Sequence, residues 1–312
     1  MNLHNFICPE TGASLRREGD ALVGGARPYP IVNDIPRFVI SDNYAEAFGL
    51  QWNKFKRTQL DSHTGTPLSE DRLVEAFGHN LSELAGKRIL EAGSGAGRFT
   101  EVLLKYGAEL YSFDFSNAVE ANRENNMPND RLTLFQGDIR HIPFQDGFFD
   151  AVVCLGVLQH TPSTTESLKE LTRVLKRGGE LVTDHYKWHL GNFTSLHLVW
   201  WSLIKRLPRE KQLKTTESLT RFFYPLHWRF RKSEVAQKVI RRVSPLNFHY
   251  GVFDLSDELL YEWSRLDTHD RNTDHFKRHV TRRQYERMLK SLGFREVNAF
   301  VAHQGVVARC VK

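Results

Sequence analysis

The sequence predicts an α/β fold in which a largely parallel sheet is flanked by helices, and three observations predict it. Residues 89–100 read Ile-Leu-Glu-Ala-Gly-Ser-Gly-Ala-Gly-Arg-Phe-Thr and join a short apolar strand to a helix through three glycines at alternate places. Residues 148–160 form an apolar run of the kind that a parallel strand buried on both faces needs. Residues 174–184 read as a helix end, a Gly-Gly turn and a further strand.

The glycine turn indicates which kind of ligand it binds. Glu91 stands two positions before Gly93, and Gly95 and Gly97 follow. Residues without a Cβ atom let the backbone approach a ligand closely at a strand-to-helix turn. A dinucleotide fingerprint reads G-x-G-x-x-G and delivers a pyrophosphate to the helix N-terminus. Here the pattern is E-x-G-x-G-x-G, and a carboxylate at the strand end would repel phosphates but suit an α-amino group. The turn therefore favours a zwitterionic ligand.

The next segments continue the same site. Residues 109–114 alternate as a strand does and end in Asp114, 23 residues beyond Glu91, where a carboxylate can accept hydrogen bonds from two ribose hydroxyls. Residues 132–139 contain another strand and end in Asp138 and Ile139. Taken singly, Glu91 and its glycines could form only a tight βα turn, and Asp114 could be only a helix N-cap before Ser116, but taken together these alternatives are disfavoured.

Residues 86–184, together with the stretch from Thr281, resemble the class I S-adenosylmethionine-dependent methyltransferases in the order and spacing of these segments. The resemblance implies a Rossmann-like seven-stranded sheet and S-adenosyl-L-methionine as cofactor. It also implies that Asp138 lies against the adenine amino group and that Ile139 lies beside the ring. The implied cofactor-binding residues are Glu91, Gly93, Gly95, Gly97, Asp114, Phe115, Asp138, Ile139, Leu155 and Trp52.

Composition is that of a globular protein with a sizeable core. The 312 residues are 40% hydrophobic and 26% charged, with a net charge of +6. Residues 201–250 carry twelve Lys or Arg and three Glu, so the basicity belongs to one segment. The three cysteines are far apart, no secretory signal opens the sequence, and no apolar stretch is long enough to span a bilayer. These features predict a cytoplasmic protein.

Two units are expected before the methyltransferase domain. Residues 1–40 are expected to form a small β module. Within it, Cys8 to Gly12 resembles a zinc-ribbon-like segment that precedes some methyltransferase domains or serves others as a separate activator subunit. Thr11 stands where a second cysteine would be, so we expect no metal there. Residues 41–80 are expected to form a helical lid. Tyr44, Phe48, Trp52 and Phe55 recur at helical spacing, and they either pack on the domain or place Gln51, Trp52 or Arg57 over the cofactor.

The methyltransferase domain is expected to comprise residues 81–185 and 281–312. Thr281 to Gln284 is a capping box that opens a last helix, Gly293 ends it, and two closing strands follow. Residues 186–280 are too many for a simple connection and are expected to form a helical insertion that recognises the substrate.

The insertion has three parts, each with open alternatives. A Trp-rich helix at 192–207 either caps the domain or lies at a membrane interface near a lipid-linked substrate. The basic aromatic stretch 221–232 could contact RNA phosphates and bases, although it matches no RNA-binding module and nucleic acid is not expected as partner. Residues 266–275 are polar, are expected to form a loop, and are either solvated or bind a sugar or a divalent ion; no metal ligands are assigned.

The chemistry of methyl transfer points to the carboxyl ends of the fourth and fifth strands. The enzyme must align a nucleophile, exclude water and remove a proton when the nucleophile is a hydroxyl. His160 is the first candidate base because an imidazole titrates near neutral pH, and His185 is the second. Both could instead be structural, and a carbon or nitrogen nucleophile would need no dedicated base.

The predicted function is methylation of a small molecule or glycan intermediate, on oxygen, in a biosynthetic pathway. The acceptor could be lipid-linked, with the protein in peripheral contact with a membrane. Two alternatives are an RNA methyltransferase and a cofactor-binding regulatory protein without turnover. The oligomeric state and the identity of the acceptor are not predicted.

Overall fold

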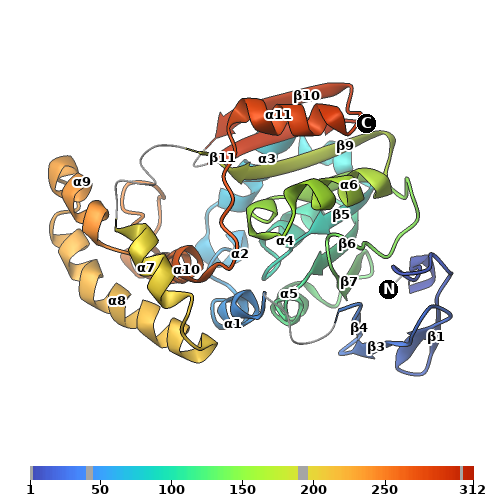
Figure 1. Ribbon diagram of the computed structural model, residues 1–312, viewed down its shortest axis with the longest axis horizontal. Helices are drawn as coiled ribbons and strands as arrows, with labels where there is room; N and C mark the ends of the chain where they lie inside the picture. Colours follow the sequence, from blue (N-terminus) through green and yellow to red (C-terminus); the bar gives the residue numbers. More distant parts are fainter. Residues whose placement is uncertain (1–2, 40–44, 189–195, 303–304) are drawn as a thin grey trace.

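The chain is built around a seven-stranded mixed sheet (Figure 1). The computed structural model describes residues 3–39, 45–188, 196–302 and 305–312. The strand order is β10-β11-β9-β8-β5-β6-β7. The strands are β5 (Arg88–Ala92), β6 (Glu109–Asp114), β7 (Leu132–Gln136), β8 (Phe149–Cys154), β9 (Leu175–Tyr186), β10 (Glu296–Ala302) and β11 (Gly305–Val311). Strands β5 to β9 pair in parallel, and β11 pairs antiparallel with β9 and β10. The predicted Rossmann-like sheet of seven strands is confirmed.

Both faces of the sheet are covered. Ile89 and Leu90 are neighbours in β5, yet they enter two different apolar clusters because successive side chains of a strand point to opposite faces. The helices that follow or precede the strands are η2 (Leu81–Leu84), α3 (Leu68–Phe77), α4 (Arg98–Lys105), α5 (Val119–Asn126), η3 (Leu158–His160), α6 (Thr164–Val174) and α11 (Arg282–Ser291). The capping box at Thr281 and Gln284 opens α11 as predicted.

The Gly178-Gly179 pair does not make the turn that the sequence predicts. Helix α6 ends at Val174 and β9 begins at Leu175, so both glycines lie inside the strand. The ladder between β8 and β9 shifts register between Phe149 and Ala151. Gly178 has a φ of +75°, which a residue with a side chain rarely adopts. The pair therefore accommodates an irregularity in the strand.

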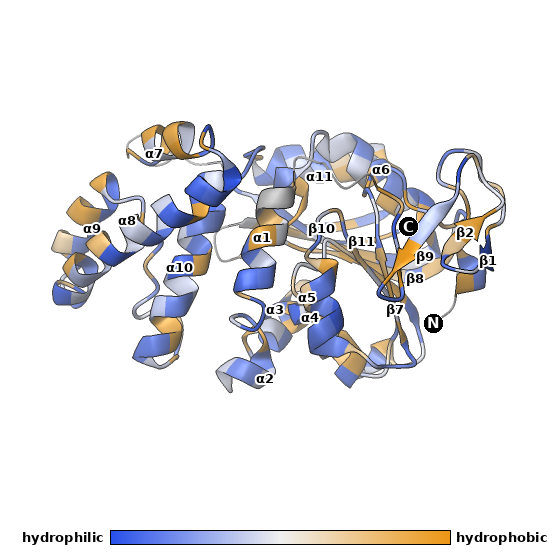
Figure 2. Cartoon of the chain, turned by 90° about the horizontal axis from the view of Figure 1, so that it is seen from below, coloured by the Kyte–Doolittle hydropathy of each residue, from blue (hydrophilic) through white to orange (hydrophobic). Residues whose placement is uncertain are grey.

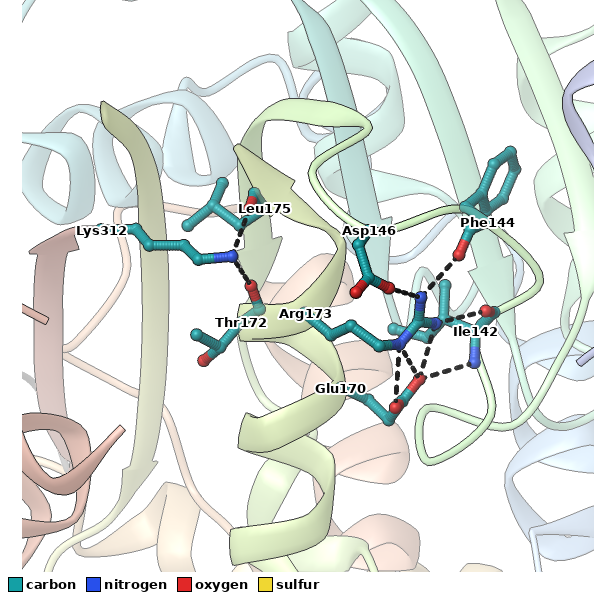
Figure 3. Close-up of polar contacts among 8 residues, drawn as sticks. All are labelled: Ile142, Phe144, Asp146, Glu170, Thr172, Arg173, Leu175 and Lys312. Carbon is teal, nitrogen blue, oxygen red and sulfur yellow. Dashed lines mark hydrogen bonds and ion pairs between the residues drawn. The ribbon is translucent and has the colours of Figure 1, made fainter. Parts of the chain in front are cut away.

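Two basic side chains, Arg173 and Lys312, fix the amino edge of β8 and β9 (Figure 3). The glycine turn lies at the opposite edge, at the carboxyl end of β5. The Arg173 guanidinium donates to the carbonyls of Phe144 at 2.7 Å and Ile142 at 2.8 Å and pairs with Glu170 and Asp146. Lys312 Nζ donates to the carbonyls of Thr172 and Leu175. The Thr172 and Leu175 carbonyls lie at the C-terminal end of α6, where carbonyls lack helical partners, and Lys312 satisfies them. Arg173 instead holds the loop before β8.

The N-terminal segment forms a separate four-stranded antiparallel sheet. It comprises η1 (Leu3–Asn5), β1 (Arg16–Glu18), β2 (Ala21–Val23), β3 (Tyr29–Val32) and β4 (Ile35–Pro36). Phe38 donates its backbone N–H to the Gln136 carbonyl at 2.8 Å, beside the β7 edge. Phe6 and Phe38 also contact the Phe135 ring. The module thus packs on the outer strand of the large sheet.

The remaining helices lie in the left part of Figure 1, away from the N-terminal module. They are α1 (Glu46–Lys54), α2 (Asp61–Thr64), α7 (His197–Ile204), α8 (Arg209–Arg229), α9 (Glu234–Val243) and α10 (Asp257–Thr273). The prediction of a loop at 266–275 is wrong, because most of this segment is the C-terminal half of α10. Its polar residues recur at helical intervals. Tyr44 and Asn192, which the sequence placed in predicted helices, lie outside the described residues.

Candidate active site

The glycine turn connects β5 to α4 and has the left-handed backbone that requires glycine. The φ angles of Gly93, Gly95 and Gly97 are +79°, +53° and +90°. A Cβ on Gly93 would lie 2.2 Å from Val157 Cγ2, and one on Gly97 would lie 2.3 Å from Asn122 Oδ1. The turn is therefore constrained both by its dihedrals and by close neighbours.

Asp114 lies at the end of β6 directly beside the glycine turn. Its Oδ2 accepts a hydrogen bond from Gly95 N at 3.0 Å, and its Oδ1 accepts from the backbone N–H and the hydroxyl of Ser116. Burial raises the pKa of this carboxyl, while those hydrogen bonds oppose the shift. The structure thus brings together two of the residues that the sequence assigns to the cofactor.

Glu91 is buried in β5 and has one carboxylate oxygen without a partner. Its Oε2 accepts hydrogen bonds from Thr100 at 2.5 Å and Ser112 at 2.7 Å. Its Oε1 has no hydrogen-bond partner among the described residues. Burial raises the pKa of Glu91 to about 7, against the effect of the two hydroxyls. A buried acceptor atom that lacks a donor, next to glycines that leave the backbone open, fits a ligand with an amino group.

The other residues that were expected to bind the cofactor make contacts with the rest of the protein. The Asp138 carboxylate pairs with the Arg140 guanidinium at 2.7 Å, so an adenine amino group would have to share or displace that partner. Ile139 and Leu155 are buried in the apolar clusters on either side of the sheet. The carbonyl of Phe115 accepts from Gln136 Nε2. None of these contacts tests a role toward the cofactor.

Helix α1 links the glycine turn to the candidate base. A Cβ on Gly95 would lie 3.1 Å from the Trp52 indole, so the ring rests against the turn. One turn earlier in the helix, the Phe48 ring lies 5.2 Å from the His160 ring between centroids. Gln51, between them, is fully buried, and its amide makes no hydrogen bond of ordinary geometry among the described residues. The amide nevertheless lies close enough to Asp270 to lower the pKa of that carboxyl.

His160 lies in η3, and each of its ring nitrogens has a polar neighbour. Nδ1 is 3.3 Å from the Phe276 carbonyl, and Nε2 is 3.3 Å from the Tyr186 hydroxyl. A carbonyl only accepts, so Nδ1 carries the proton and Nε2 accepts from Tyr186. Burial and the nearby Lys277 ammonium lower the pKa of His160 to about 3, and the ring is therefore neutral at physiological pH.

His185 occupies a different place from His160. It is 1% exposed, its Nε2 lies 3.2 Å from the Thr164 hydroxyl, and its ring contacts Tyr285 of α11. Its neighbours in β9, Asp184 and Tyr186, point to the other face of the sheet, as the alternation of a strand requires. The structure therefore brings Tyr186, rather than His185, to His160.

A group of charged residues at the C-terminal end of α10 faces this region, where the sequence predicted a loop. Asp267 and Asp270 share one face of α10, since they are three residues apart, and Asp274 follows at the C-cap of the helix. Asp274 Oδ2 lies 3.5 Å from His160 Nδ1, and Asp274 Oδ1 lies 3.1 Å from Lys277 Nζ. Burial and repulsion from Asp274 and Asp267 raise the pKa of Asp270 to about 8. Reading residues 266–275 with helical periodicity would have found this group.

Three more residues complete the charged region. Asp184 accepts from Gly156 N at 2.6 Å and from Arg72 at 2.6 Å. Arg98 follows the glycine turn. Burial and repulsion from the nearby Arg72 guanidinium lower the pKa of Arg98 to about 9. Neither arginine was predicted, because an arginine in an ordinary helix carries no recognisable sequence signal. Across the described part of the chain, no group of three or more His, Cys, Asp or Glu is arranged to hold a metal ion.

Comparison with known proteins gives a family for the central segment. Residues 90–183 match a family model described as "Methyltransferase domain". A demethylmenaquinone methyltransferase from Clavibacter sepedonicus is 35% identical over 103 residues, which cover 33% of this chain and 42% of that protein. Methyltransferase GfsG from Streptomyces halstedii is 28% identical over 160 residues, covering 49% of this chain and 54% of that protein. The chain thus spans less than half the length of the demethylmenaquinone methyltransferase that it matches.

Solved structures are similar at low sequence identity. Human N-acetylserotonin methyltransferase in complex with S-adenosylmethionine has a TM-score of 0.48 at 13% identity, covering 88% of this chain and 60% of that chain. Magnesium protoporphyrin IX methyltransferase from Synechocystis PCC 6803, with bound S-adenosylhomocysteine, has a TM-score of 0.46 at 16% identity, covering 86% of this chain and 96% of that chain.

Proposed function

We propose that this chain, whose residues 90–183 form a class I S-adenosylmethionine-dependent methyltransferase domain, methylates a hydroxyl group of a small molecule or glycan intermediate. The observation that carries the proposal is the position of His160 Nε2, a hydrogen-bond acceptor 3.3 Å from the Tyr186 hydroxyl at the carboxyl ends of β8 and β9. When bound, S-adenosylmethionine supplies a methyl group on a positively charged sulfur. Glu91, Asp114 and the glycine turn are the residues that would hold it.

The three side chains Tyr186, His160 and Asp274 form a route for the proton of the acceptor hydroxyl. Tyr186 takes that proton as it passes its own to His160 Nε2, or the hydroxyl donates to Nε2 directly. His160 alone is a weak base, because its pKa is about 3. Burial raises the pKa of Asp274 to about 6, so this carboxyl is largely ionised at neutral pH and can stabilise a charged imidazolium 3.5 Å away. Such positioned bases accelerate proton transfer by about 10²- to 10⁴-fold.

The acceptor is proposed to lie between the sheet edge and α10. The fully buried Gln51 amide lies beside the half-buried Asp270 carboxyl, and the amide lacks a hydrogen-bond partner of ordinary geometry among the described residues. Buried polar groups of this kind gain most from a ligand that donates and accepts several hydrogen bonds, as a polyol does. Several matched relatives are named for small acceptors, including demethylmenaquinone and a sterol.

Helix α1 is proposed to exclude water from the reaction, because Trp52 rests on the glycine turn and Phe48 on His160. The three cysteines are buried free thiols, which supports a reducing compartment such as the cytoplasm.

Calorimetry with S-adenosylhomocysteine and label transfer test the function in two steps. We expect S-adenosylhomocysteine to bind and Asp114→Ala to weaken that binding by about tenfold or more, since hydrogen bonds to a charged group contribute about 1.5–3 kcal/mol. We then expect methyl-labelled S-adenosylmethionine to label a component of a small-molecule extract through an ether or ester bond. Failure of S-adenosylhomocysteine to bind, or label found only on nitrogen or RNA, would overturn the proposal.

A further inference from the structure

Helices α7, α8 and α9 expose apolar side chains on their outer faces. Of the sixteen large apolar side chains that are exposed in the described part of the chain, ten lie between residues 196 and 243. Phe222 in α8 is 73% exposed, and Val239 in α9 is 62% exposed. Single exposed apolar residues need no explanation, but a concentration of them marks an interaction surface.

Two of these helices have the reverse of the usual polarity. The buried residues of α8 are Gln212, Thr216, Thr220 and His227, all polar. Its exposed face carries Phe222 and Leu226, and exposed Phe230 follows at the C-cap at the same interval of four. In α9, Gln237 is the buried residue, while Val235, Val239 and Val243 are exposed at the same interval. A helix in water normally buries its apolar side, so these outer faces are suited to a non-aqueous contact.

Hydrogen bonds between the polar inner faces fix the orientation of the helices, although Gln212 Oε1 and His227 Nε2 have no partner among the described residues. The Thr216 hydroxyl pairs with His269 Nδ1 of α10 at 2.9 Å. His227 pairs with Gln237 of α9 at 2.8 Å, and the Gln237 amide donates back to the His227 carbonyl. Turning the apolar faces inward would break these bonds.

The apolar residues of the three helices join into one surface. Trp200 of α7 donates its indole N–H to the Val243 carbonyl at the end of α9, and its ring contacts Phe223 of α8. Phe223 in turn contacts Phe222. Figure 2 shows these helices, with apolar segments on α7 and α9, at the end of the molecule opposite the N-terminal module.

Positive charge accompanies this surface. Between residues 196 and 243, nine Lys or Arg are exposed, against two exposed acidic residues, Glu210 and Glu234. A second copy of the chain would bring like charges together. A nucleic acid would match the charge but not the valines and leucines, since bases stack on aromatic side chains. An anionic lipid surface matches both, because it attracts basic residues and takes up apolar side chains.

We propose that the outer faces of α7, α8 and α9 dock the protein on an anionic lipid bilayer. Among the described residues, no helix is long and apolar enough to cross a membrane. The contact is therefore interfacial, through side chains such as Leu203, Phe222 and Val239 between the basic residues.

Vesicle co-sedimentation of the full chain tests the proposal without requiring activity. We expect binding to vesicles of phosphatidylcholine mixed with phosphatidylglycerol, weaker binding to phosphatidylcholine alone, and a partial loss of binding as salt is raised. Phe222→Asp and Val239→Asp should each lower the partition coefficient by about tenfold, the amount expected for one buried apolar side chain. Val301→Asp is the matched control: Val301 is a half-exposed valine in β10, outside the surface, and its replacement should leave binding unchanged.

Several outcomes would overturn the proposal. One is absence of binding to phosphatidylglycerol vesicles at low salt. Another is binding that Phe222→Asp and Val239→Asp leave intact, since the apolar side chains would then not insert. A dimer that these variants dissociate, measured by analytical ultracentrifugation without vesicle binding, would identify a second copy as the occupant. Calorimetry with S-adenosylhomocysteine checks that each variant is folded, and a failure of cofactor binding in the parent would concern the proposed function alone.

Discussion

The Tyr186 hydroxyl donates a hydrogen bond to His160 Nε2, 3.3 Å away, and this bond joins the end of β9 to η3. The two rings meet edge to face, with centroids 5.3 Å apart. Since the His160 Nδ1 proton faces the Phe276 carbonyl, the tautomer is set by the backbone. The pair is therefore oriented before any acceptor arrives, which is the condition for efficient proton transfer.

Removing either partner should slow methyl transfer without weakening cofactor binding. We expect Tyr186→Phe and His160→Gln each to lower kcat by about 10²-fold or more, in the range typical of a lost general base. Radiolabel transfer to the extract acceptor measures kcat, and calorimetry with S-adenosylhomocysteine measures the cofactor affinity. His185→Gln should retain much of the activity. A loss in His185→Gln that exceeds the loss in His160→Gln would reverse the assignment of the base.

The charges on α10 should make stability depend on pH in a defined direction. The pKa of Asp270 is raised from 3.8 to about 8, mainly by burial. The folded state therefore favours the protonated carboxyl. The stabilisation of the folded state by protonated Asp270 is complete below about pH 4, falls as pH rises, and is lost above about pH 8. The free energy of unfolding falls by roughly 1.4 kcal/mol per pH unit across this range, and structural relaxation makes the change smaller.

Asp270→Asn tests this direction because asparagine cannot ionise. We expect urea unfolding to give similar free energies for parent and variant near pH 4, and a variant that is more stable than the parent near pH 8. Asp257→Asn, at the exposed start of α10, is the control and should show no such divergence. A parent that gains stability relative to Asp270→Asn as pH rises would contradict the assignment.

The sequence predicts the sheet well because its signals are local. The glycine turn, the strand ending in Asp114 and the capping box at Thr281 each depend on neighbouring residues, and each appears as predicted. The strand irregularity at Gly178 was missed because a glycine pair is equally suited to a turn and to a bulge.

The site was only partly predictable, for a physical reason. His160 and Asp274 are brought together by tertiary packing over 114 residues, and no local pattern encodes that contact. The aspartates at the end of α10 were read as a loop because polar residues usually stay in water, whereas here Asp274 is buried and Asp267 and Asp270 are half-buried. The outward apolar faces of α8 and α9 were not predicted, because helical spacing identifies an apolar side of a helix but not what covers it.

The Arg173 cluster should be important for stability and not for chemistry, since it lies at the amino edge of β8 and β9 (Figure 3). Arg173→Ala leaves the carbonyls of Ile142 and Phe144 without their donor. We expect a loss of about 1–3 kcal/mol in the free energy of unfolding, measured with urea. Lys169→Ala, at an exposed position of the same helix, is the matched control and should cost about 0.5 kcal/mol or less. Equal losses in the two variants would show that the cluster contributes nothing specific.

Cofactor binding should release a proton from Glu91 near neutral pH. The pKa of Glu91 is raised to about 7 by burial, so the free protein holds a partly protonated carboxyl there. The α-ammonium group of S-adenosylhomocysteine would favour the ionised form, so its binding should strengthen as pH rises through about 7 and should displace the proton.

Calorimetry in buffers of different ionisation enthalpy measures that proton. We expect the binding enthalpy of the parent near pH 7 to vary with the buffer, and that of Glu91→Gln to vary less. The variant should also bind about tenfold more weakly above pH 7, because the amide cannot supply the negative charge. Glu166→Gln, on the exposed side of α6, should behave as the parent does. If the parent enthalpy is the same in every buffer, Glu91 does not titrate on binding, and the ammonium group must be held by other residues.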